Sequence, residues 1–129
     1  MNGIARYFML LALLWIVIGM TWGIQMAAMN DHTLAPAHAH LNLVGWVTFA
    51  IFAFYYHLVP GAAQGRLAKL HLAVAVAGVV LMIPGIAMAV TRQGEALAKI
   101  GSLLTLISTL IFAAAVLRGP GKPALRGAA

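Results

Sequence analysis

The chain has 129 residues, of which 64% are hydrophobic and only 8% are charged, and its mean hydropathy is +0.99. An ordinary soluble domain has roughly 25% charged residues. A chain of this length has too much surface to hide so much apolar area in one globular core. The composition therefore excludes a soluble enzyme and indicates one domain that lies in lipid.

Four apolar segments follow one another along the chain, separated by the few charged residues. A bilayer core about 30 Å thick is crossed by about 20 helical residues. No alternation typical of β-barrel strands is present, so the segments predict an all-α integral membrane protein. We expect four transmembrane helices in up-down order at approximately 6–29, 37–59, 67–91 and 97–117, followed by a flexible cytoplasmic tail at 118–129.

The basic residues predict the direction of these helices. With the N-terminus in the cytoplasm, the outer side has Arg92 and Lys99 balanced by Asp31 and Glu95. All the other basic residues lie inside, so the split is +6 against 0, a positive-inside pattern. This predicts a multi-pass protein of a bacterial-type inner (plasma) membrane with both termini cytoplasmic. Because the basic residues are spread over helix ends and the tail, nucleic-acid binding is not expected. The inner residues are Arg6, Arg66, Lys69, Arg118, Lys122 and Arg126.

Two histidines, His38 and His40, follow Pro36 at the outer end of the second predicted helix. An ionisable residue inside a membrane helix is a functional candidate, because burying it without a partner is costly. Residues at i and i+2 point about 200° apart on a helix, so these two imidazoles should serve two sites rather than chelate one ion. The positive end of the helix dipole favours the neutral ring, the form that binds metals and haem iron.

Gly45 lies seven residues after His38, which on an α-helix is about 20° off the same line and two turns further in. A glycine at that position could leave room for a flat macrocycle. The residues alone leave three interpretations of His38 and His40: haem ligation, a copper or other metal site, or a structural polar pair bonded across helices.

The motif resembles one helix of a known family. It consists of His38-x-His40, Gly45-Trp46-Val47, an aromatic stretch, Tyr56 and Leu58-Val59-Pro60. It is similar to the tenth transmembrane helix of the catalytic subunit of heme-copper oxidases, above all of C-type cytochrome oxidases and nitric oxide reductases. The resemblance implies that His38 corresponds to the high-spin haem ligand and His40 to the low-spin haem ligand. It also places Gly45 and Trp46 beside the cofactor.

That family's subunit has twelve helices in three arcs of four, so a homotrimer of this chain would be similar to the whole ring. The resemblance then implies haem b at each protomer interface of a membrane cytochrome, used for electron transfer, with quinone as a candidate partner, or for O2 or NO binding. The family's copper site is not expected, because the third helix has only His71. No carboxylate lies within any predicted helix, so a proton-pumping oxygen reductase is not expected. An electron carrier or gas binder is expected rather than an enzyme, and oxidoreductase activity stays open as an alternative.

Other interpretations stay open beside haem binding. Met26, Met29 and His32 recur every three residues before the two histidines, and thioether and imidazole ligands suit Cu(I), so a copper-handling protein is the main alternative. A cofactor-free scaffold subunit of a respiratory complex is a third. His57 and His71 are expected at the inner membrane interface. The Gly19-x-x-x-Gly23 spacing is typical of a helix contact.

Overall fold

The computed structural model describes residues 1–120, all of whose regular elements are helical. Positions 121–129 of the predicted tail lie outside the described residues, and Arg118, which was expected to begin that tail, ends the last helix. Four helices are long and apolar enough to cross a membrane, which confirms the all-α, four-helix prediction. The elements are α1 (Gly3–Met29), α2 (Ala35–His40), η1 (Leu41–Val47), α3 (Thr48–Leu58), α4 (Arg66–Val90) and α5 (Ala96–Arg118).

The helix ends follow from local chemistry. Asn30 ends α1 in the left-handed conformation, with φ of 51°, and its N–H donates to the Ala27 carbonyl. Asparagine is one of the few residues that adopt this helix-ending conformation readily. Pro36 lies in the first turn of α2, where its missing N–H costs nothing. The predicted ends differ most at the start of α1, which begins at Gly3 rather than at Arg6.

The second membrane-spanning helix is one continuous rod, Ala35–Leu58, built from α2, η1 and α3. Its middle part, Leu41–Val47, is a π-helix, in which backbone hydrogen bonds run from i to i+5. Such segments are rare in proteins, and those that occur are often found at functional sites. This one begins directly after His40, so the rotation per residue below the two histidines is smaller than in an α-helix.

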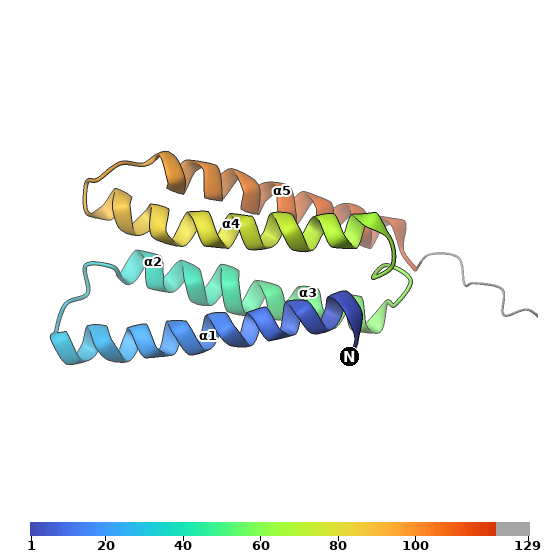
Figure 1. The fold of residues 1–129 in the computed structure, drawn as a ribbon, viewed down its shortest axis with the longest axis horizontal. Helices are drawn as coiled ribbons and strands as arrows, with labels where there is room; N and C mark the ends of the chain where they lie inside the picture. Colours follow the sequence, from blue (N-terminus) through green and yellow to red (C-terminus); the bar gives the residue numbers. More distant parts are fainter. Residues whose placement is uncertain (121–129) are drawn as a thin grey trace, which may run out of the picture.

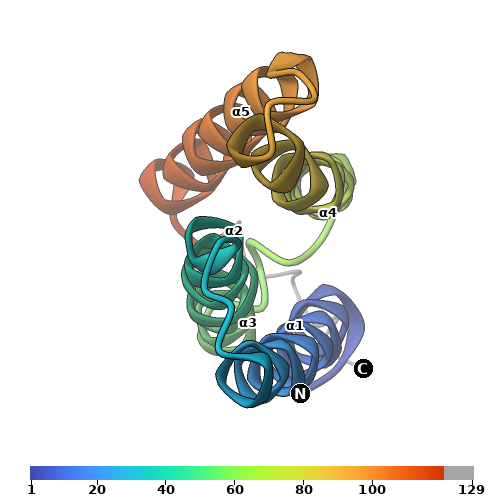
Figure 2. The same cartoon turned by 90° about the vertical axis from the view of Figure 1, so that its left-hand side faces the viewer.

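The four long helices form two hairpins that lie side by side, α1 with the α2–η1–α3 rod and α4 with α5 (Figure 1). Seen along the helices, α1 and α4 occupy one side of the molecule, and α3 and α5 occupy the other (Figure 2). The first residues of α1 and of α4 lie at the same end (Figure 1). The loop before α2 and the loop before α5 lie together at the opposite end, which carries His38 and His40.

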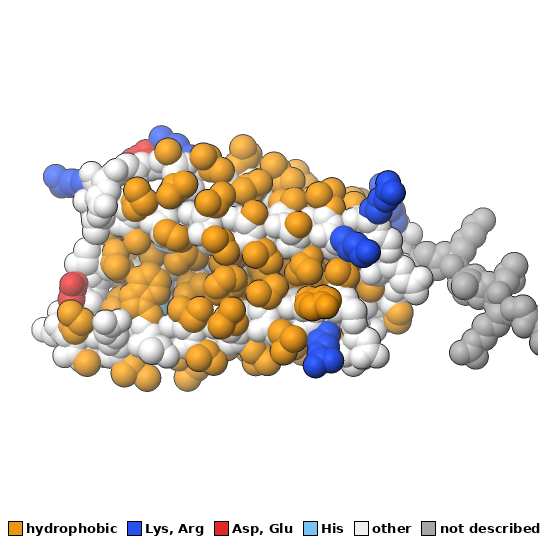
Figure 3. Space-filling model, viewed as in Figure 1, with side chains coloured by type: hydrophobic (Ala, Val, Ile, Leu, Met, Phe, Trp, Pro, Cys, Tyr) orange, Lys and Arg blue, Asp and Glu red, His pale blue; other side chains and the backbone are white. Residues whose placement is uncertain are grey.

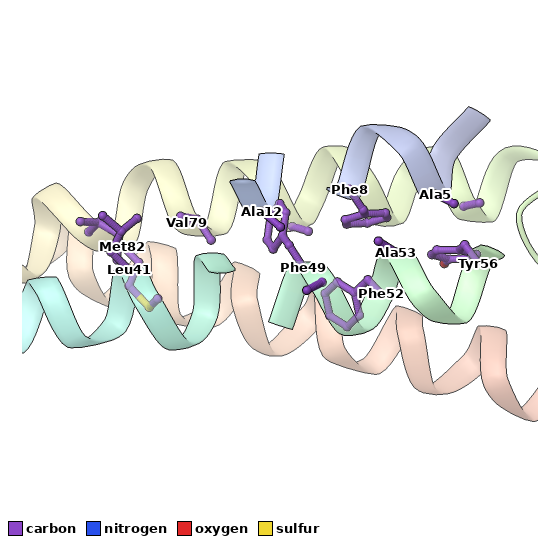
Figure 4. Packing of buried hydrophobic residues seen from close by; sticks show 14 of the residues in the cluster. Ala5, Phe8, Ala12, Leu41, Phe49, Phe52, Ala53, Tyr56, Val79 and Met82 are labelled. Atoms are coloured by element: carbon purple, nitrogen blue, oxygen red, sulfur yellow. The ribbon is translucent and has the colours of Figure 1, made fainter. Parts of the chain in front are cut away.

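The core is a row of buried side chains between the two hairpins (Figure 4). Phe8 of α1 packs edge-on against Phe49 and Phe52 of α3, with ring centroids 5.4 Å apart in both pairs, and stacks on Tyr56 at 5.7 Å. Many large apolar side chains, Leu10 among them, are exposed. Hydrophobic side chains cover much of the face seen in Figure 3. An exposed apolar surface around a small buried core is what a lipid environment favours.

Candidate functional site

The His38 side chain is partly buried and faces α1. Its ring lies edge-on to Trp22, with ring centroids 6.2 Å apart. A Cβ atom added to Gly23 would lie 3.0 Å from Cε1 of His38. The glycine therefore makes the room that the imidazole occupies between the two helices.

Asn42, one turn after His38, extends this contact. Its amide Nδ2 donates to Nε2 of His38 at 3.1 Å, and its Oδ1 lies where a Cβ of Gly19 would be. Gly19 and Gly23 are one turn apart and form a groove in α1 that receives Asn42 and His38. The contact expected from the Gly19-x-x-x-Gly23 spacing is therefore present.

Three polar atoms in the contact between α1 and the second rod are buried without a hydrogen-bond partner among the described residues. They are Nε1 of Trp15, Nδ1 of His38 and Oδ1 of Asn42. An unpaired buried polar atom costs about 1–3 kcal/mol. The contact between α1 and the second rod therefore contains three polar groups whose burial lowers stability.

His40 has the opposite surroundings, because its side chain is exposed. Its Nδ1 lies 2.7 Å from the Pro36 carbonyl oxygen, which accepts the Nδ1 proton. The neutral ring then keeps the lone pair of Nε2 free for another group. Metal-ligating histidines are typically oriented in this way, with the other ring nitrogen bound to a backbone carbonyl or carboxylate. The two imidazoles thus face different sides of the helix, as their i, i+2 spacing indicates.

Gly45 and Trp46 lie in the π-helix. A Cβ atom on Gly45 would be 2.9 Å from Cγ of Trp15, so the indole of Trp15 fills the space above the glycine. A macrocycle could enter there only if Trp15 adopted another rotamer. Trp46 is partly buried and packs against the core. Sequence reasoning did not single out Trp15, because its contact with Gly45 depends on how α1 is placed.

The methionines of the copper alternative lie at the C-terminal end of α1. A cavity of about 220 Å³ is lined by Met26, Met29 and Asp31, together with Trp22, Gln25 and Leu34. Hydrogen bonds from the side chain and backbone of Thr33 lower the pKa of Asp31, so a carboxylate is present at its edge. His32 is exposed and is not part of the lining. Residues 1–120 contain no group of three His, Asp or Glu side chains placed to hold a metal ion.

His71, which was expected at the membrane interface, lies in the second turn of α4, and its side chain is fully buried within the helix bundle. The hydroxyl of Tyr56 donates to its Nδ1 at 2.9 Å. The rings of Phe52 and Phe8 lie 4.5 and 5.0 Å from the imidazole, between centroids. His57, by contrast, is exposed at the end of α3. No spacing in the sequence connects Tyr56 with His71, since they meet only when α3 packs on α4.

Comparison of the chain with protein-family models, with curated proteins and with solved structures finds no match.

Proposed function

We propose that this chain is a small membrane cytochrome that binds haem b at the outer end of its second transmembrane helix. The four helices cross a bacterial-type plasma membrane in up-down order, with both termini cytoplasmic. The resemblance of the His38-x-His40 helix to the heme-copper oxidases supports this function. Electron transfer, with quinone as a candidate partner, and binding of O2 or NO are the two activities that such a protein can have.

The observation that carries the proposal is the side chain of His40. Its ring is exposed, and the bond of Nδ1 to the Pro36 carbonyl at 2.7 Å holds the ring and leaves Nε2 free. A histidine that merely fills space in a helix contact would be buried. An exposed imidazole with one nitrogen held by a hydrogen bond is suited to bind the iron of a haem that lies between two protomers.

The homotrimer belongs to this proposal. In the trimer, the second helix of each protomer would lie at an interface, where His40 would be one of the residues that hold the haem. His38 provides a second ligand only after it releases Asn42, to which it is bonded within its own chain. With His38 retained by Asn42, one coordination position stays open, which favours gas binding; with His38 released, bis-histidine ligation favours electron transfer.

When haem is bound, it supplies the redox and gas-binding chemistry, and the chain controls its surroundings. The Pro36 carbonyl fixes the tautomer and orientation of His40 and raises its basicity as a ligand.

A reduced-minus-oxidised absorption spectrum of the detergent-purified protein tests the proposal. We expect haem b bands in the parent protein and their loss in His40→Ala. His57→Ala is the matched control, because His57 is an exposed histidine at the opposite end of the same rod. Unchanged bands in His40→Ala, or a monomer that carries a full complement of haem, would contradict the proposal.

Copper handling is the second candidate, and the cavity shared by Met26 and Met29 favours it. Thioethers bind Cu(I), and the nearby carboxylate of Asp31 would attract the cation. Elemental analysis and titration with Cu(I) in competition with a chelator test this alternative. We expect Met26→Leu with Met29→Leu to abolish copper binding if this function holds, and a colourless protein containing copper would replace the haem proposal.

A further inference from the structure

A groove runs along the surface of the molecule between α1 and α4, on the face turned to the viewer in Figure 3. Its volume is about 570 Å³. It exists because these two helices touch only slightly, while each packs closely on its own hairpin partner. The groove is lined by Tyr7, Leu10, Leu11 and Leu14 of α1 and by Lys69, Leu72, Ala73 and Val76 of α4.

The two walls of the groove have the same pattern. Each set of four residues has i, i+3, i+4, i+7 spacing, so each forms one stripe along its helix. Both helices begin at the same end of the molecule (Figure 1), so Tyr7 and Lys69 lie toward that end. The apolar residues continue from there for about 10 Å along the helix axes. The groove is thus polar at one end and apolar along the rest of its length.

The polar end is also the basic end of the molecule. Basic side chains gather there in Figure 3, and Arg6 and Arg66 belong to the first turns of the same two helices. Both acidic residues, Asp31 and Glu95, lie in or beside the loops at the other end. Lys69 is exposed and makes no ion pair within the described part of the chain. The positive ends of the α1 and α4 dipoles point the same way and add to this field.

We propose that the groove between α1 and α4 is a binding site for an acidic phospholipid, with the phosphate at Lys69 and one acyl chain along the leucines. A basic pocket between transmembrane helices at the cytoplasmic surface suits an anionic headgroup. The assignment to the cytoplasmic leaflet rests on the proposed orientation, but not on haem binding. A tyrosine at the headgroup level, here Tyr7, is typical of the membrane interface.

A second copy of the chain is a poorer occupant of the same groove. In a parallel oligomer, every copy presents Arg and Lys side chains at the level of Lys69. Within residues 1–120, no acidic side chain lies at that level to pair with them. Packing another protomer into the groove would therefore bury the Lys69 ammonium against like charges, which is unfavourable. A phosphate provides the charge that this chain does not.

Native mass spectrometry of the full chain in detergent, with added phosphatidylglycerol or phosphatidylcholine, tests the proposal. We expect the parent protein to retain phosphatidylglycerol and not phosphatidylcholine. Lys69→Gln should reduce retention about five-fold, since one basic residue near an anionic lipid contributes about a factor of this size. Arg118→Gln is the matched control, because Arg118 is an exposed basic residue at the same end on α5, away from the groove. It should leave retention unchanged.

Leu72→Trp is a second variant, which fills the apolar part of the groove and keeps every charge. It should also lower retention of phosphatidylglycerol, while circular dichroism reports the same helix content as the parent. If Lys69→Gln and Arg118→Gln lost phosphatidylglycerol to the same extent, the lipid would be held only by the overall positive charge of that end. This result would overturn the proposed site. Full retention in Lys69→Gln, or an oligomer without lipid in which the groove residues cross-link to a second protomer, would overturn it as well.

Discussion

At the scale of single residues, Asn42 is the residue that holds the His38 side chain in place. Its Nδ2 donates to Nε2 of His38 at 3.1 Å, and its Oδ1 is buried against the Gly19 backbone. If Nδ2 donates, the proton of the neutral ring is on Nδ1, which is itself buried and unpaired among the described residues. The hydrogen bond from Asn42 stabilises the orientation in which the His38 ring faces α1.

Replacing Asn42 by alanine should therefore change how the proposed haem binds carbon monoxide. Without the Asn42 amide, Nε2 of His38 is free to bind iron, and a second histidine ligand closes the open position. We expect reduced Asn42→Ala to bind less carbon monoxide than the reduced parent, measured as the amplitude of the difference spectrum. Asn42→Ala combined with His38→Ala should restore it. Equal amplitudes in the parent and Asn42→Ala would show that Asn42 does not control ligation.

The buried pair of Tyr56 and His71 allows a second prediction at this scale. Tyr56→Phe removes the donor and leaves Nδ1 of a fully buried imidazole without a partner. The free energy of unfolding should fall by about 1–3 kcal/mol, the cost of an unsatisfied buried group. His71→Phe added to Tyr56→Phe should recover part of the loss, because replacing both partners by apolar rings is nearly neutral.

Thermal unfolding in detergent, followed by circular dichroism, measures the stability of the parent, the single variant and the double variant. Tyr55→Phe is the control, because Tyr55 donates only to a backbone carbonyl, that of Ala115, at a longer 3.2 Å. It should cost less than Tyr56→Phe. A double variant no more stable than Tyr56→Phe alone would show that the bond to His71 is not what Tyr56 contributes.

The histidines also show which residue-scale features the sequence could predict. His38 and His40 are recognisable because membrane helices have few polar residues, and their opposite surroundings follow from i, i+2 spacing. Asn42 could have been found in the same way, since it lies four residues after His38 and so on the same face. The burial of His71 could not, because it depends on the packing of α3 against α4, which no local pattern encodes.

Glycines control how closely the elements approach. In the α4–α5 hairpin, a Cβ on Gly101 would meet the backbone of Met82, and one on Gly85 would meet the backbone of Leu97 and Ala98. Backbone cannot move aside without shifting a whole helix. In the α1–α2 contact, a Cβ on Gly23 would meet only the ring of His38, at 3.0 Å. The two contacts should therefore respond differently to an added methyl group.

Gly101→Ala should lower the free energy of unfolding by about 1–3 kcal/mol, the usual cost of overpacking. Gly23→Ala should cost less, since the far end of a side chain can shift by a few tenths of an ångström. The measurement is thermal unfolding in detergent, with Gly23→Ala as the matched Gly-to-Ala comparison. If Gly23→Ala were the more damaging variant, backbone contact would not be what limits the approach of α4 and α5.

The π-helix is the element that sequence patterns did not predict. Placing Gly45 two turns below His38 assumed a constant 100° per residue, which holds in an α-helix. Over Leu41–Val47 the i to i+5 bonds reduce that rotation, and Gly45 meets Trp15 of α1. The π-helical segment lies where the rod makes its contacts with α1. Those contacts are not visible in a single apolar segment.

For the whole molecule, the number and ends of the membrane-spanning helices were predictable, because bilayer thickness limits their length and charged residues stay at their ends. The relative positions of the helices were not. That α1 and α4 share one side, with a groove between them, depends on how the two hairpins pack (Figure 2). The sequence of an apolar, lipid-facing segment does not indicate which other helix it packs against.

The charged residues at the two ends of the molecule predict its orientation in the membrane. The described residues at the proposed inner end include Arg6, Arg66, Lys69 and Arg118, and no acidic residue lies among them. At the other end, Lys99 pairs with Glu95 at 2.8 Å. This hydrogen bond lowers the pKa of Glu95, so the two side chains stay ionised and cancel. The end with more basic residues is the one expected to stay in the cytoplasm.

The chain has no cysteine, so single cysteines can report this orientation directly. Gln93→Cys lies in the exposed loop before α5, and Gln64→Cys lies in the exposed loop before α4. We expect a membrane-impermeant maleimide to label Gln93→Cys in intact cells and to label Gln64→Cys only after the membrane is opened. The reverse pattern would put His40 on the cytoplasmic side and move the proposed lipid site to the outer leaflet, since both positions depend on the same charges.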